Sequence, residues 1–232
     1  MSPPSLPSVA PSASVSPASP SPSASGPAPA TVTIRGLKLD AQDDPEGRDR
    51  RLTFTTHGPA AVVAHIESLA PRLTVDACLV VNAVELFCTS GRTFTMNGST
   101  SRSNALWALT LRGQGGATPT LDVSLAFPSA EPTFTIDGAW FDGAARPDRN
   151  GVVVELVPRA GPLVSIGATW DGSHDYRLTI QPPSGTGLVF EGTANAVTQD
   201  VLLAGGELHR IELLNTGAGA DHVTFTATIA WR

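Results

Sequence analysis

Thr31-Val32-Thr33-Ile34-Arg35-Gly36, with Asp40 four residues further on, decides the fold because the chain repeats it. The second occurrence is Thr133-Phe134-Thr135-Ile136-Asp137-Gly138, 102 residues later, again with an aspartate, Asp142, four residues further on. Both runs are rich in the residues that favour strands. The repeat therefore predicts two copies of one β-rich unit.

The far ends of the two copies repeat as well. Trp107-Ala108-Leu109-Thr110-Leu111-Arg112-Gly113 precedes His209-Arg210-Ile211-Glu212-Leu213-Leu214-Asn215 by 102 residues. Apolar and polar residues alternate in most of the intervening sequence, which is typical of half-buried strands. Residues 60–69 are the one segment whose pattern also fits a helix. Because the equivalent segment of the second copy, 163–169, reads as a strand, we expect strands in both segments. One such strand places four apolar residues on one face: Leu121, Val123, Leu125 and Phe127.

These patterns predict an all-β protein with two tandem, duplicated β-sandwich domains of the jelly-roll or immunoglobulin-like type. About seven to nine short strands are expected in each copy. We expect the domains at 31–128 and 132–232. Proline at both ends of Pro128-Ser129-Ala130-Glu131-Pro132 makes the connection short and stiff.

Residues 1–30 have a different composition. Ser, Pro and Ala fill 25 of the 30 positions and none is charged, so we expect a disordered tether. The tether is either a spacer between the folded part and an anchor or a tail without a role. It resembles the linker that follows the lipid-bearing cysteine of bacterial lipoproteins. The resemblance implies an extracytoplasmic protein, secreted or lipid-anchored, whose signal sequence was removed before Met1.

The charge balance limits the partners. Residues 31–130 carry nine acidic and nine basic side chains, whereas residues 131–232 carry twelve acidic and six basic ones. A neutral or acidic surface argues against nucleic acid and anionic membranes, which select basic patches. No apolar run approaches the length of a transmembrane segment. We expect a polysaccharide or another protein at the cell surface as the partner.

The second copy contains recognisable turn motifs. Asp175-Tyr176-Arg177-Leu178-Thr179-Ile180 enters the turn Pro182-Pro183-Ser184-Gly185, and Leu203-Ala204-Gly205-Gly206-Glu207 leads into Ile211-Glu212-Leu213-Leu214-Asn215-Thr216-Gly217. With these motifs residues 163–230, and more faintly 62–127, resemble the bacterial pre-peptidase C-terminal type of β-sandwich. The resemblance implies a non-catalytic accessory module of secreted proteins, some of which bind calcium or polymers.

Cys78 and Cys88 are the only cysteines, and they lie symmetrically about Ala83. An alignment of Leu73-Thr74-Val75 with Leu178-Thr179-Ile180 places them at the mouth of a hairpin, where they can face each other. We predict a disulfide that stabilises the fold by about 2.5–3 kcal/mol and favours an oxidising compartment. The alternative is a pair of buried thiols.

An acidic loop supplies a candidate calcium site with four carboxylates: Asp40, Asp43, Asp44 and Glu46. Calcium prefers several oxygen ligands, and such a loop provides them. The alternative is a solvated loop whose charge is neutralised by the arginines that follow it. Asp171 and Asp175 form a second candidate. No other cofactor is expected.

Trp140 and Trp170 each precede a polar loop and are therefore candidates for stacking on sugar rings. The alternative for both is packing in the core. Trp107 and Trp231 continue the apolar faces of their strands, so we expect both in the core.

The five histidines stand in no nucleophile or metalloprotease motif, so we expect no enzyme. The sequence favours a non-catalytic extracytoplasmic binding or adhesion protein of the bacterial cell envelope. The alternative is a structural subunit of a surface layer, an appendage or a virion.

Overall fold

The computed structural model describes residues 29–39, 49–57, 59–117, 119–128, 134–140, 151–158, 161, 163–170, 176–192, 196–216 and 224–231. For 29, 49–50, 57, 85–86, 116, 134–140, 170, 192 and 224–231 only the backbone is described. These ranges contain one short 3₁₀ turn, Gln114–Gly116, and sixteen strands. The strands are β1 Pro29–Lys38, β2 Asp49–His57, β3 Ala60–Ser68, β4 Val75–Val81, β5 Val84–Gly91, β6 Thr93–Thr100, β7 Asn104–Gly113, β8 Thr120–Pro128, β9 Phe134–Trp140, β10 Gly151–Leu156, β11 Leu163–Trp170, β12 Tyr176–Gln181, β13 Leu188–Gly192, β14 Ala196–Leu202, β15 His209–Asn215 and β16 Thr224–Trp231.

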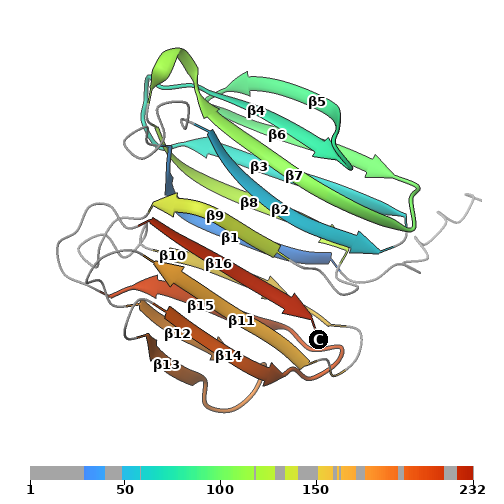
Figure 1. The fold of residues 1–232 in the computed structure, drawn as a ribbon, viewed down its shortest axis with the longest axis vertical. Helices are drawn as coiled ribbons and strands as arrows, with labels where there is room; N and C mark the ends of the chain where they lie inside the picture. Colours follow the sequence, from blue (N-terminus) through green and yellow to red (C-terminus); the bar gives the residue numbers. More distant parts are fainter. Residues whose placement is uncertain are drawn as a thin grey trace, which may run out of the picture.

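The strands pair into two long antiparallel layers (Figure 1). The first sheet runs β13-β12-β15-β10-β1-β8-β3-β6. The second sheet runs β14-β11-β16-β9-β2-β7-β4-β5. The pair of Lys38 with Trp140 links the two sheets.

Each copy has the strand order of a jelly roll. The first copy contributes β1-β8-β3-β6 to one sheet and β2-β7-β4-β5 to the other. Adding eight to every number gives the second copy, β9-β16-β11-β14 and β10-β15-β12-β13. Two four-stranded sheets in this order form the double Greek key of the jelly roll. The prediction of an all-β fold with duplicated β-sandwiches is confirmed, and the jelly roll is the type adopted.

Both sheets run across the boundary between the copies. β1 pairs with β10 and places Ile34 opposite Val152, while β2 pairs with β9 and places Leu52 opposite Ile136. Because each junction joins the first strand of one copy to the second strand of the other, a pseudo-twofold axis along the strands relates them. The proposed division into domains at 31–128 and 132–232 stays a prediction, although β1 begins at Pro29, two residues earlier than expected.

Alternation of side chains builds the core between the sheets. In β3 every second residue from Ala60 to Ser68 is buried, so the strand predicted at 60–69 is confirmed, as is the one at 163–169. Phe54 stacks on Trp107 at 6.0 Å and on Phe127 at 4.7 Å between ring centroids. Each fully buried large apolar side chain contributes about 1.5–3 kcal/mol to folding. Buried residues of both copies form one continuous core.

Cys78 and Cys88 form a disulfide between directly opposed residues of β4 and β5. The two strands are joined by Asn82 and Ala83, both with positive φ, the geometry of a type I′ hairpin turn. The alignment used for the prediction is wrong by four residues. Cys78 lies opposite Thr110 of β7, and Thr179 lies opposite Glu212, the equivalent residue of β15. Cys78 is therefore equivalent to Thr179, so the cysteines lie within the strands and not at the mouth of the hairpin.

The strand ends meet at two rims of the sandwich, because all neighbouring strands are antiparallel. The loop rim contains the end of β1, the start of β2 and the ends of β9, β11 and β15. The apolar rim contains the start of β1, the end of β2 and the starts of β3, β7, β11 and β15. In Figure 1 the arrow of β9 points to the loop rim and that of β16 to the apolar rim.

Candidate functional site: the loop rim

The two predicted sugar-binding tryptophans end their strands at the loop rim. Trp140 ends β9 and pairs with Thr224, and Trp170 ends β11 and pairs with Phe225. Thr224 and Phe225 are consecutive residues of β16, which lies between β9 and β11. Neighbouring strands are about 4.8 Å apart, so the two tryptophan backbones are about 10 Å apart. The fold therefore brings together two residues that are 30 positions apart in the sequence.

The predicted calcium loop starts at the same place. Lys38, the last residue of β1, pairs with Trp140, and the acidic segment begins two residues later. Asp40, Asp43, Asp44 and Glu46 lie outside the described residues, as do Asp171 and Asp175. Leu39 is fully buried and its N–H donates to the carbonyl of Pro119 at 3.1 Å. The base of the acidic loop is thus fixed beside Trp140.

The bulge in β1 before this loop is fixed by a side chain. Gly36 has φ 67°, a conformation that glycine adopts without strain, and its N–H donates to Asp122 Oδ1 at 2.9 Å. The register of β1 against β8 shifts between Ile34 and Leu37. The glycine of the repeated motif therefore sets the direction in which β1 enters the loop rim.

Two polar residues are buried under the loop rim in the second copy. Tyr176 begins β12, directly after the loop that follows Trp170, and Asn215 lies opposite it at the end of β15. Both are fully buried. Burial raises the pKa of the Tyr176 phenol far above its usual value, so this hydroxyl stays protonated throughout the physiological pH range.

The described residues contain no group of three or more histidine, cysteine or carboxylate side chains able to hold a metal ion. Since the acidic loop lies outside them, the calcium site stays a prediction. In the described part of the rim, Lys38, the only lysine of the sequence, lies next to the backbone of Trp140.

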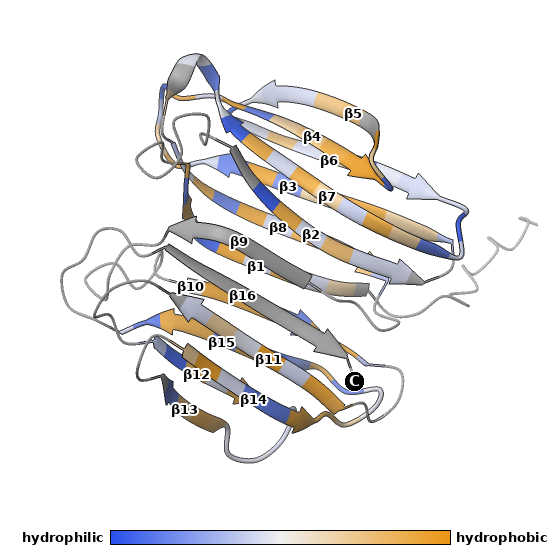
Figure 2. Cartoon of the chain, viewed as in Figure 1, coloured by the Kyte–Doolittle hydropathy of each residue, from blue (hydrophilic) through white to orange (hydrophobic). Residues whose placement is uncertain are grey.

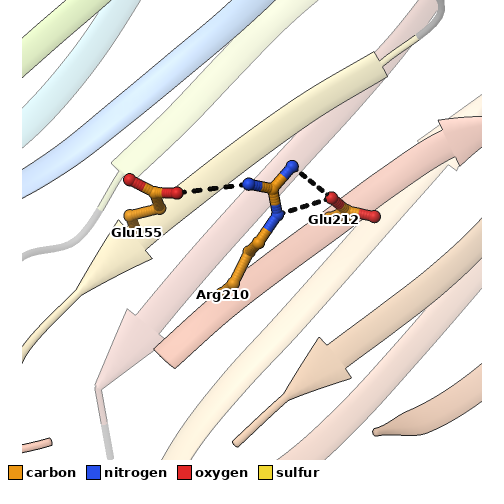
Figure 3. Close-up of polar contacts among 3 residues, drawn as sticks. All are labelled: Glu155, Arg210 and Glu212. Carbon is orange, nitrogen blue, oxygen red and sulfur yellow. Dashed lines mark hydrogen bonds and ion pairs between the residues drawn. The ribbon is translucent and has the colours of Figure 1, made fainter. Parts of the chain in front are cut away.

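A charged cluster lies away from the loop rim, on the first sheet of the second copy (Figure 3). Arg210 contacts Glu212 at 2.6 Å on its own strand and Glu155 at 3.3 Å on the neighbouring β10. One arginine therefore pairs with two carboxylates across the strands, and the cluster keeps one net negative charge. The spacing of Arg210 and Glu212 could have suggested their contact, whereas Glu155 needed the register of β10 against β15.

The remaining singled-out residues have structural roles where they are described. Trp107 is buried, as predicted, and its indole N–H donates to Thr56 Oγ1 at 2.9 Å. His209 is buried, with Nδ1 2.9 Å from the carbonyl of Glu207 and Nε2 accepting from Ala204 N–H at 3.2 Å. The side chain of Trp231 lies outside the description.

Sequence analysis did not identify Lys38 as part of this rim. Its proximity to Trp140 depends on a pair between the first and second copies, and no local pattern encodes that pair. The fact that it is the only lysine is the one signal that the sequence offered.

Comparison with known proteins identifies no family: no family model and no curated protein matches the chain. Among solved structures it is similar to the CBM22-1–CBM22-2 tandem domain of Xyn10C from Paenibacillus barcinonensis, with 9% identity, TM-score 0.26 and coverage of 76% of this chain and 79% of that one. A protein from Parabacteroides distasonis, described as secreted, matches with 10% identity, TM-score 0.24 and coverage of 87% and 81%. The T=1 Penaeus vannamei nodavirus matches with 12% identity, TM-score 0.20 and coverage of 87% and 97%. At these TM-scores the likeness assigns no role to any residue of this chain.

Within the described residues, no helix is long and apolar enough to cross a membrane.

Proposed function

We propose that this chain is a non-catalytic, extracytoplasmic binding protein of the bacterial cell envelope that holds a polysaccharide at its loop rim. The observation that carries the proposal is that β9 and β11, on either side of β16, end at the loop rim with Trp140 and Trp170, beside the start of the acidic loop. Tryptophan rings stack well on the apolar faces of sugars, so a tryptophan at the end of either strand is suited to hold a sugar unit at this rim.

The acidic loop complements the tryptophans. It begins beside Trp140, and its carboxylates are suited either to accept hydrogen bonds from sugar hydroxyls or to bind calcium. Lys38 at its base adds a donor. The disulfide supports an oxidising compartment, where a ligand of the cell surface is available.

A depletion assay tests the proposal. The full chain is mixed with insoluble cell-wall, plant or fungal polysaccharides, with calcium or with a chelator, and the protein left in solution is measured. We expect depletion on at least one polymer and its loss in Trp140→Ala and Trp170→Ala, by about 10-fold or more in affinity each. Loss of depletion with the chelator alone would assign the acidic loop to calcium.

The matched control is Thr95→Ala with Asn97→Ala, two exposed residues in the middle of β6 and far from both tryptophans. These changes should leave depletion unchanged. If no polymer depletes the wild-type protein, or if both tryptophan variants bind as well as the wild type, polysaccharide binding at this rim is wrong.

A structural subunit is the second candidate. The observation that favours it is that β13 and β5 end the path of paired strands through both copies, and that β14 and β6 each pair with one neighbour. Unpaired strand edges are templates for adding another chain. Assembly that grows without limit as the protein concentration rises would support this candidate over a binding protein.

A further inference from the structure

The loop between β14 and β15, residues 203–208, crosses from the second sheet to the first at the apolar rim. Its first residue, Leu203, is buried in the core. Next to it Leu202 lies opposite Leu163, and Figure 2 shows hydrophobic colour at the end of β14 and at the start of β11. The loop therefore covers the end of the core of the second copy, and its release exposes Leu203 to water.

A single imidazole ring makes two hydrogen bonds to this loop. His209 Nε2 accepts from the N–H of Ala204 at 3.2 Å, and His209 Nδ1 lies 2.9 Å from the carbonyl of Glu207. A further bond runs from the N–H of Gly206 to the carbonyl of Pro158 at 2.7 Å. Because Nε2 accepts a hydrogen bond, the proton of the neutral ring is on Nδ1 and is donated to the carbonyl of Glu207.

The closed loop leaves no place for a second proton on this ring. His209 is 2% exposed and both of its ring nitrogens are used. An added proton must enter on Nε2, where it meets the N–H of Ala204, so two donors face each other and the bond is lost. Burial also disfavours the charged form of the ring. A proton therefore binds better when the loop is open, and by linkage acidification opens the loop.

No charged side chain in the described segments around His209 faces the ring. The charged residues of β10, β11, β12, β14, β15 and the loop are Glu155, Arg177, Asp200, Glu207, Arg210 and Glu212. All are half-buried or exposed, and those on strands alternate with core residues, so they lie on the outer faces of the sheets. Tyr176, which also titrates, begins β12 at the opposite rim, and Arg159 lies outside the described residues. No described carboxylate therefore offsets the charge of a protonated ring inside the sandwich.

The first copy has groups that do not titrate at the equivalent place. Trp107 is equivalent to His209, and its indole N–H donates to Thr56 Oγ1. Beside it Asn82 Oδ1 accepts from the N–H of Leu106 at 2.9 Å. Neither an indole nor a side-chain amide takes up a proton in the range from about pH 5 to about pH 8, in which histidine does. The first copy is therefore an internal control.

We propose that His209 makes the loop at residues 203–208 an acid-operated latch, which is closed at neutral pH and released in acid. Release of the latch gives access to Leu203 and to the core beneath it. This end of the sandwich lies at the rim opposite Trp140 and Trp170, so the inference is independent of the proposed ligand.

Amide hydrogen exchange of the full chain, followed by NMR from about pH 7.5 to about pH 5, tests the latch. Protection of the Ala204 amide, corrected for the intrinsic pH dependence of exchange, should fall by about 10-fold or more as the pH is lowered. The amide of Leu106 also bonds to a side chain at this rim, but that side chain does not titrate, so its protection should stay constant.

His209→Gln takes up no proton in this range, so the loop should lose its pH dependence whatever its protection at neutral pH. The matched control, His65→Gln, removes an exposed histidine that bonds to Thr95 Oγ1 and should leave the pH dependence unchanged. Nitrogen chemical shifts of the wild-type imidazole need no variant, and they should place the proton on Nδ1 at neutral pH. Constant protection of Ala204 in the wild type, a pH dependence that persists in His209→Gln, or a proton on Nε2 at neutral pH overturns the inference.

Discussion

The two jelly rolls of this chain have the same strand order, but they are stabilised differently. In the first copy Phe54 stacks against Trp107, and the indole N–H of Trp107 bonds to Thr56 inside the core. In the second copy the equivalent residues are Leu156 and His209, which are again directly opposed. The imidazole of His209 bonds to the backbone of the loop before β15, so it fixes a loop where Trp107 fills the core.

The hairpin β4–β5 of the first copy and the equivalent hairpin β12–β13 of the second also differ in what stabilises them. The first copy joins β4 to β5 with a disulfide between Cys78 and Cys88, whereas the second copy has Thr179 opposite Val189 at the equivalent place. The comparison teaches that the same strand order forms with an aromatic core and a disulfide in one copy and with neither at the equivalent positions of the other. Because the sheets and the core are continuous, we expect the first copy to stabilise the second.

The largest expected effect breaks the aromatic core of the first copy. Trp107→Ala removes a fully buried indole and should lower the free energy of unfolding by about 3–5 kcal/mol, measured by urea denaturation followed by circular dichroism. Because two strand pairs join the copies, unfolding should remain a single transition. Two separate transitions would show instead that the copies unfold independently.

His209→Ala is the matched change in the second copy. It leaves the N–H of Ala204 and the carbonyl of Glu207 without their partner and should cost about 1–3 kcal/mol. A loss equal to that of Trp107→Ala would contradict the difference between the two cores.

The next effect concerns the disulfide. Cys78→Ala with Cys88→Ala should lower the free energy of unfolding by about 2.5–3 kcal/mol, because the unfolded chain is no longer crosslinked. The reciprocal change, Thr179→Cys with Val189→Cys, sharpens the comparison because these residues are also directly opposed. It should form a second disulfide, detected by the absence of free thiols, and raise the stability. Failure of this disulfide to form under oxidising conditions would mean that the two hairpins are not equivalent.

The smallest effect is expected at the charged cluster. Arg210→Met removes both ion pairs, but the three side chains are partly exposed, so the cost should be about 0.2–1 kcal/mol and should decrease at high salt. Urea denaturation at low and high salt measures it. A loss as large as that of the disulfide would contradict this ranking of covalent above ionic stabilisation.

The sequence by itself determined the strands, their duplication and the disulfide. Alternation over Leu121 to Phe127 identified a buried face because side chains in a strand point to opposite sides at a period of two. Cys78 and Cys88 could be paired because they are ten residues apart around one turn, so their opposition is a local matter. The error of four residues in aligning the hairpins arose because apolar residues at alternate positions fit equally well after a shift by an even number.

Only the tertiary structure decided which strand edges join and what the rims contain. A period of two shows which face of a strand is buried, but not which of many similar strands pairs with it, so β1–β10 and β2–β9 could not be read from the pattern. Those two junctions fix the pseudo-twofold axis, whereas the pairing of β16 with β9 and β11 places Trp140 and Trp170 on one rim. The physical reason is that the identity of a neighbouring strand depends on long-range backbone pairing and the burial of both sheets together, and neither is a property of any single segment.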